Sequence, residues 1–297
     1  FSLKHFIPLK MFSAEEDKQK QGEIRCHLAN IEFADGNPDG ALDQVAKACE
    51  IAPIPPMQAH AEFIRGQVAR KNKKLPAASD HFKRANEIAG KAGIGPLALE
   101  SGLALGETLL MGRKYEQSSQ VLGQVAQMAG RLKNAPRERS ATALLAQSLA
   151  GLQRWEEALK FASRSHQLTR ELNFKGLESF DLFHMGYFNL KMGKHEEAVN
   201  LFKESRSGAD ARNAGFQKDL LFHMGQAMHE SGDEAGAQFR LAGGDRLRID
   251  PGPADLARQA AILDLRTAIH HHLYTLVFQP RRARIVAHGQ LHPDHLG

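Results

Sequence analysis

Six side chains that recur at near-equal spacing could hold a peptide backbone. Three glutamines, an asparagine, a glutamate and a tyrosine follow one another at steps of 37, 40, 40, 40 and 39 residues. A carboxamide both donates and accepts hydrogen bonds, and the N–H and C=O groups of an extended peptide alternate. The spacing therefore predicts a polar binding row, with a solvated surface as the alternative. The row comprises Asn30, Gln67, Glu107, Gln147, Tyr187 and Gln226.

Three aromatic residues accompany this row and could grip apolar side chains of the same ligand. Each lies four positions before a row member, so the two share a helical face. Arg70, Lys71 and Lys191 lie near the rim of that face and would favour an acidic peptide through electrostatic steering. The competing interpretations are helix–helix core for the aromatics and solubility for the cations. The aromatic residues are Phe63, Phe183 and Phe222.

The fifteen histidines do not form a recognisable metal site. Three of them, at 270–272, are adjacent and so point to different faces of a helix. Residues 290–297 are similar to part of the metallo-β-lactamase motif, but Gln290 replaces its first histidine. His184 and His223 recur in one register, which favours packing or hydrogen bonding and leaves pH sensing as an alternative. Because no phosphate-binding loop or nucleophile elbow occurs, we predict a non-enzymatic protein without metal or cofactor.

The composition is that of a soluble globular protein, with 42% hydrophobic and 25% charged residues. The net charge of +5 is spread along the chain, so nucleic-acid binding is not expected. No apolar run reaches the roughly 18 residues that a membrane span requires. The two cysteines, Cys26 and Cys49, are too few for a disulfide framework and suggest reduced thiols. We therefore predict a cytoplasmic location.

The helices that carry the polar row are indicated by an internal repeat. Residues 182–186 return almost unchanged at 221–225, and a small residue stands twelve positions after the glycine of each copy. The same pair of small residues can be followed along the chain, and it marks the places where two helices touch. The first members are Ala29, Gly66, Gly106, Ala146, Gly186 and Gly225. The second members are Ala41, Ala78, Ser118, Ala158, Ala198 and Ala237.

This pattern resembles the tetratricopeptide repeat, a helix–turn–helix unit with small residues at these places. The motif Gly-x₁₁-Ala-x₃-Phe occurs at Gly66/Ala78/Phe82 and at Gly186/Ala198/Phe202. Pro53 matches the proline that closes the unit, and Tyr115 and Trp155 match its aromatic residue near the turn. The period here is about 40 residues instead of about 34. The long form is similar to that of kinesin light chain, Pins-type scaffolds and Rap-type regulators.

Local signals divide the chain. Ser13 to Glu16 form a capping box that predicts the start of the first helix, and prolines at 53, 55 and 56 end the first repeat. We expect residues 1–21 to hold an N-terminal extension and the start of the first helix, and residues 22–246 to form six repeats. Residues 247–279 are expected to form a capping helix, and 280–297 a loosely ordered, basic, histidine-containing tail.

These observations predict an all-α protein, a right-handed α-solenoid of about six hairpins with a C-terminal capping helix. A hairpin that cannot shield its own apolar side stacks on its neighbours and leaves a concave groove. The favoured function is an adaptor that binds a peptide or partner segment in this groove. The resemblance to Rap-type regulators implies an alternative, a signal-peptide sensor that changes superhelical pitch. Self-association through the terminal segments is a further possibility, since Phe1, Leu3, Phe6 and Ile7 could fill a groove.

Overall fold

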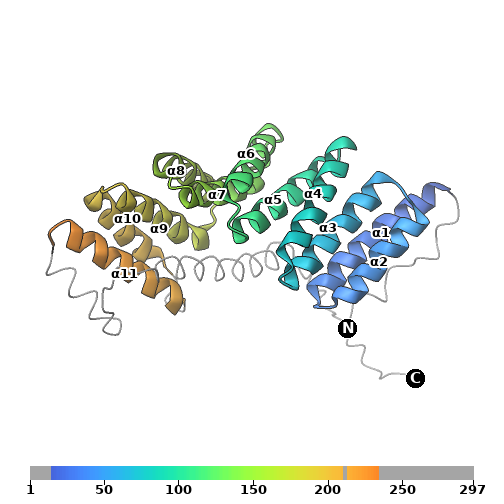
Figure 1. The fold of residues 1–297 in the computed structure, drawn as a ribbon, viewed down its shortest axis with the longest axis horizontal. Coiled ribbons are helices and arrows are strands. Elements are labelled where there is room, and N and C mark those ends of the chain that lie inside the picture. The colour runs from blue at the N-terminus through green and yellow to red at the C-terminus, as the bar shows by residue number, and fades with distance from the viewer. Residues whose placement is uncertain (1–14, 210–212, 234–297) are drawn as a thin grey trace, which may run out of the picture. The chain divides into compact units, whose positions relative to one another are not determined.

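A computed structural model describes residues 15–209 and 213–233, which form eleven α-helices and no strand (Figure 1). Consecutive helices pair into five complete hairpins, and the last helix opens a sixth. The helices are α1 (Glu15–Ala34), α2 (Pro38–Ile51), α3 (Pro55–Lys71), α4 (Leu75–Lys91), α5 (Gly95–Met111), α6 (Tyr115–Arg131), α7 (Ala135–Gly151), α8 (Trp155–Glu171), α9 (Lys175–Lys191), α10 (His195–Gly208) and α11 (Ala214–Glu230). The predicted all-α solenoid is confirmed.

The repeat divides into two equal halves. Each helix from α3 to α9 has 17 residues, and each from α4 to α9 begins 20 residues after the one before it. The same three-residue turn therefore serves inside hairpins and between them. Its middle residue has a positive φ, which costs a residue with a side chain about 1–2 kcal/mol. Five of these positions are not glycine: Lys73, Arg113, Lys133, Gln153 and Asn173, with φ between 52° and 60°.

The helix starts follow from local chemistry. Proline occupies one of the first two positions of α2, α3, α4, α5 and α7, where its missing N–H is not needed. Asn37, Asn134 and Asn213 cap α2, α7 and α11, each accepting a hydrogen bond from a backbone N–H three residues on. Turn and cap residues thus fix where each helix begins.

Small residues let the two helices of a hairpin touch, as the repeat predicted. A Cβ added to Gly66 would lie 2.7 Å from the Phe82 ring, and one on Gly106 would lie 2.5 Å from Leu122. All the small residues of both sets that lie in the described residues are buried. The small positions therefore mark helix–helix contacts; Ala237 lies outside the described residues.

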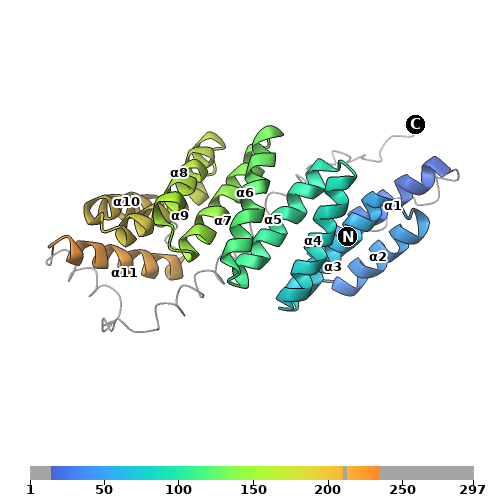
Figure 2. The same ribbon diagram turned by 45° about the horizontal axis from the view of Figure 1, so that its top comes forward.

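The helices form two layers. Each helix packs against the next one, and the first helices also contact one another, α1 with α3, α3 with α5, α5 with α7 and α9 with α11 (Figure 2). We call the side of this layer that points away from the second helices the first-helix face. The predicted capping helix, the tail and the first twelve residues lie outside the described residues.

Candidate functional site

The structure places the six residues of the polar row on the six first helices, one on each of α1, α3, α5, α7, α9 and α11. Asn30 is exposed, and the other five are partly buried. Each follows a small residue that is buried against the second helix of its hairpin, and a step of about 100° per residue separates the row from that contact. The row therefore steps along successive first helices, and α1–α3, α3–α5, α5–α7 and α9–α11 are in contact.

Two amides of the row already make hydrogen bonds. Gln147 Nε2 donates to the carbonyl oxygen of Ala143 at 3.0 Å, and Gln226 Nε2 donates to Glu230 Oε1 at 2.9 Å. Both bonds stay within one helix, so rotation of the side chain can exchange them for bonds to a ligand. The exchange lowers the net gain from each new bond, which is about 0.5–1.5 kcal/mol.

Two of the three predicted aromatic contacts belong to the core. Phe63 is 6% exposed and lies 5.6 Å from the Phe82 ring, and Phe183 is 3% exposed and lies 5.8 Å from Phe202. Both rings are buried against the phenylalanine of the second helix, so the expectation that they line a groove is corrected. Phe222 is only partly buried and remains a candidate contact.

Aromatic side chains nevertheless gather on α8, α9 and α11. The Tyr187 ring meets Trp155 edge-on at 6.2 Å and His223 at 5.1 Å, and Lys191 Nζ lies 5.2 Å from its centre. Phe180, which sequence reasoning missed, is partly buried and lies 4.3 Å from Phe216. With Phe222, these partly buried rings make the region from α8 to α11 rich in aromatic side chains.

The α3–α7 end carries charges that neutralise each other. Arg70 of α3 pairs with Glu107 of α5 at 2.5 Å, and Glu100 of α5 pairs with Arg137 of α7. Burial raises the pKa of Glu100, and the guanidinium of Arg137 partly offsets this effect. Since Arg70 has a carboxylate partner, its predicted part in attracting an acidic peptide is not supported.

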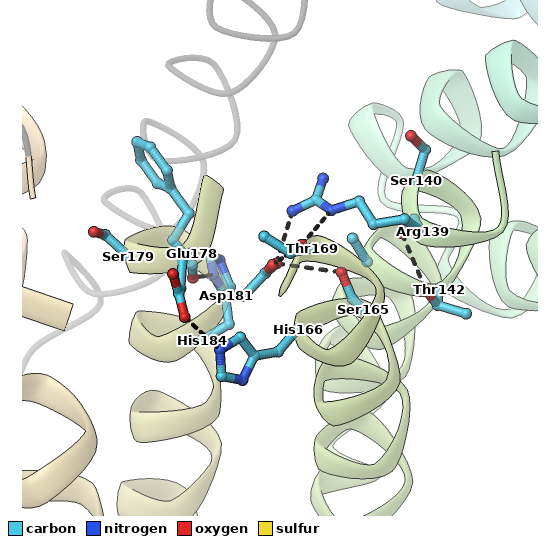
Figure 3. Close-up of polar contacts among 12 residues, drawn as sticks. Arg139, Ser140, Thr142, Ser165, His166, Thr169, Glu178, Ser179, Asp181 and His184 are labelled. Atoms are coloured by element: carbon cyan, nitrogen blue, oxygen red, sulfur yellow. Dashed lines mark hydrogen bonds and ion pairs between the residues drawn. The ribbon is translucent and has the colours of Figure 1, made fainter. Parts of the chain in front are cut away.

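A buried polar network joins α7, α8 and α9 (Figure 3). Arg139 donates to Asp181 Oδ1 at 2.8 Å and to Thr169 Oγ1 at 3.0 Å, while Thr169 and Ser165 donate to the same carboxylate at 2.5 and 3.2 Å. All four residues are buried. Sequence reasoning missed this α7–α9 polar network, although aligning the repeats would have shown two charges at positions that are otherwise uncharged or exposed.

Two histidines and a cysteine that the sequence singled out lie in packed or hydrogen-bonded surroundings. His184 Nδ1 lies 2.5 Å from the carbonyl oxygen of Phe180, and His223 is buried among aromatic rings, as packing residues would be. Burial raises the pKa of the Cys26 thiol to about 12, so the thiol stays protonated. In the described part of the chain, no three metal-ligating side chains gather. The histidines at 270–272 and the 290–297 motif lie outside it.

Comparison with known proteins gives the fold a name. No family model and no characterised sequence matches the chain. The apo form of RapI matches with a TM-score of 0.65 at 12% identity, covering 91% of this chain and 78% of RapI. PilF of Pseudomonas aeruginosa matches at 0.60 and 15% identity, covering 84% and 99%. The chain has the tetratricopeptide-repeat fold.

Another tetratricopeptide-repeat structure among the matches contains a bound factor. A Rap protein complexed with competence and sporulation factor has a TM-score of 0.54 and 14% identity, and the match covers 78% of this chain and 76% of that protein. At such identities the likeness concerns the fold alone. Among the described residues of this repeat protein, no helix has the length and hydrophobicity needed to cross a membrane.

Proposed function

We propose that this chain is a non-enzymatic adaptor that binds an extended peptide or a segment of a partner protein across the first-helix face. The observation that carries the proposal is the polar row, which offers hydrogen-bonding side chains on successive first helices while the small residues beside them are buried. The reduced cysteines favour the cytoplasm as the place of action.

The side chains of the first-helix face suggest which groups of a ligand would bind at each end of the face. Gln67, Gln147 and Gln226 would bind backbone groups, each contributing about 0.5–1.5 kcal/mol. Tyr187 and Phe222 would contact an apolar or aromatic side chain at the α9–α11 end. Because the charges at the α3–α7 end are paired, the ligand needs no strong charge of its own.

The double variant Gln147→Ala/Gln226→Ala tests the proposal. We expect the affinity for the partner, first identified by cross-linking in the source cell and then titrated by calorimetry, to fall roughly tenfold to a hundredfold. Gln124→Ala/Gln127→Ala on the exposed side of α6 is the matched control and should change nothing. Equal affinities for the two double variants would reject the polar row as the binding surface.

A signal-peptide sensor is the second candidate, favoured by the similarity to the Rap complex with its factor. A sensor changes the rotation between successive hairpins when its ligand binds, whereas a passive adaptor does not. Small-angle scattering with and without the identified ligand distinguishes them, because only the sensor changes its radius of gyration.

A further inference from the structure

The boundary between the fourth and fifth hairpins differs from every other boundary that the structure describes. Four equivalent positions, counted from the small residues, meet at each boundary. Three of the other sets are Gly22, Ala48, Ala52 and Ala61; Ala59, Ala85, Ala89 and Ser101; and Leu99, Val125, Ala129 and Ala141. The last boundary has Ser179, Ser205, Ala209 and Leu220. The fourth has Arg139, Ser165, Thr169 and Asp181, the α7–α9 polar network.

Separating two hairpins at an apolar boundary and separating them at the polar fourth boundary have different energetic consequences. At the third boundary, Leu99, Val125, Ala129 and Ala141 belong to one apolar cluster, and separating them exposes apolar surface at about 25 cal/mol per Å². At the fourth, separation returns a buried guanidinium and carboxylate to water, and their hydration largely offsets the lost ion pair. The fourth boundary is therefore easier to open at its polar end.

The polar contacts occupy only one end of this boundary. Thr169 and Asp181 lie near the end of α8 and the beginning of α9. At the opposite end, the Trp155 ring packs 6.3 Å from Phe188, which is fully buried. Among neighbouring first helices, α7 and α9 also approach each other least closely. An aromatic contact that persists at one end would act as a pivot while the polar end opens.

We propose that the fourth and fifth hairpins meet at a hinge, closed by the α7–α9 polar network and pivoting on Trp155 and Phe188. Hairpins one to four and helices α9 to α11 then move as two bodies. The hinge has a consequence that rests on the function proposed above. A partner bound to both Gln147 of α7 and Tyr187 of α9 would span the hinge, and its binding would favour one setting.

The hinge is tested without any partner, by pulsed electron resonance between nitroxide labels. Lys160→Cys and Asn200→Cys place labels across the fourth boundary, and Gln120→Cys and Lys160→Cys place them across the third. All three residues are exposed and hold equivalent positions two residues after a small residue. The labels are introduced with Cys26→Ala and Cys49→Ala, which lie in the first hairpin. We expect a broader distance distribution across the fourth boundary than across the third.

The second part of the experiment replaces the four polar residues of the fourth boundary with their counterparts from the third boundary. The variant Arg139→Leu/Ser165→Val/Thr169→Ala/Asp181→Ala gives the fourth boundary the residues of the third. In this variant, the distance distribution between labels at positions 160 and 200 should become as narrow as that between labels at positions 120 and 160. Equal widths in the wild-type protein would overturn the hinge, and so would a transplant that folds without narrowing the fourth distribution. If the transplant does not fold, the wild-type comparison decides alone. Neither result depends on the polar row, whose failure would show only in the binding titration.

Discussion

Inside the fifth hairpin, Gly186 of α9 lies against the Phe202 ring of α10, whereas one turn earlier in the same helix Asp181 meets Arg139 of α7. The first contact has counterparts at Gly66 and Gly106, whereas a buried ion pair at the positions of Arg139 and Asp181 occurs once in the described residues. Packing within hairpins is thus uniform, and the boundaries between hairpins are individual. A repeat protein can diversify at its boundaries because each unit keeps its own interior.

The largest effect is expected at the fourth boundary. Asp181→Ala leaves the guanidinium of Arg139 buried without its carboxylate, which should lower the free energy of unfolding by about 3–5 kcal/mol. Glu107→Ala breaks a pair that is more exposed and should cost only about 1 kcal/mol. Urea titration of both variants measures the difference, and equal losses would contradict the distinction between these two boundaries.

Acid should act on another boundary, through His60 of α3. Burial, with a smaller contribution from the nearby His27, lowers the pKa of His60 from the ordinary value of 6.5 to about 4. The neutral ring is therefore favoured in the folded protein, and stability is lost as pH falls from 6.5 toward 4. Between pH 7 and pH 5 the loss should reach about 2 kcal/mol. Urea titrations at both values should show this loss in the wild type, and His60→Leu should remove it.

Inside a hairpin, overpacking should have a smaller effect. A Cβ at position 186 would lie 2.8 Å from Phe202, so Gly186→Val should destabilise the protein by about 1–3 kcal/mol. Gly123 of α6 has no heavy atom within 4 Å of its added Cβ, and Gly123→Ala should instead stabilise by about 0.5–1 kcal/mol. Thermal unfolding of both variants would show opposite shifts; shifts of one sign would contradict the assigned contact.

The smallest effect is expected at the turns, because turns within a hairpin and turns between hairpins have the same backbone conformation. Lys133 lies between hairpins and Gln153 lies within one, yet their φ values are 52° and 60°. Lys133→Gly and Gln153→Gly should each stabilise by about 0.5 kcal/mol, because glycine adopts positive φ without a side-chain clash. Differential scanning calorimetry can compare the two gains. A gain at only one site would show that the turns are not equivalent.

The sequence predicted the interior of each hairpin far better than the boundaries. Ala, Gly and Ser at fixed spacing mark contacts that every unit repeats, so residues such as Gly66 and Ala78 revealed the period and the hairpins. The pairs Arg70–Glu107 and Arg139–Asp181 join residues 37 and 42 positions apart, and they depend on how one unit rests on the next. Periodicity can show that a charge stands at an unusual position of the unit, but not which side chain of the next unit it will meet.

The candidate site was predicted in part, for a related reason. The one-residue step from a buried small position predicted that Gln147 and Tyr187 turn away from the second helices; the structure has both partly buried, with Tyr187 packed on Trp155 of α8. Counting from the small residues could not decide whether Phe63 and Phe183 lie on the first-helix face or in the core, since their positions are at the border between the two. In the structure both are buried, Phe63 against Phe82 and Phe183 against Phe202.

The uniform spacing of helices α3 to α9 bears on how this protein could be lengthened. Since each helix and its turn occupy 20 residues, a 40-residue unit could be spliced in at the turn after α4 or α6 with the flanking helices still in phase. Inserting such a unit at the turn after α8 would separate Arg139 from Asp181 and leave both charged groups without their partner. Insertion after α4 or α6 would also separate an ion pair, Arg70–Glu107 or Glu100–Arg137, but both are more exposed than Arg139–Asp181. Duplication should therefore cost least early in the array and most at the turn after α8.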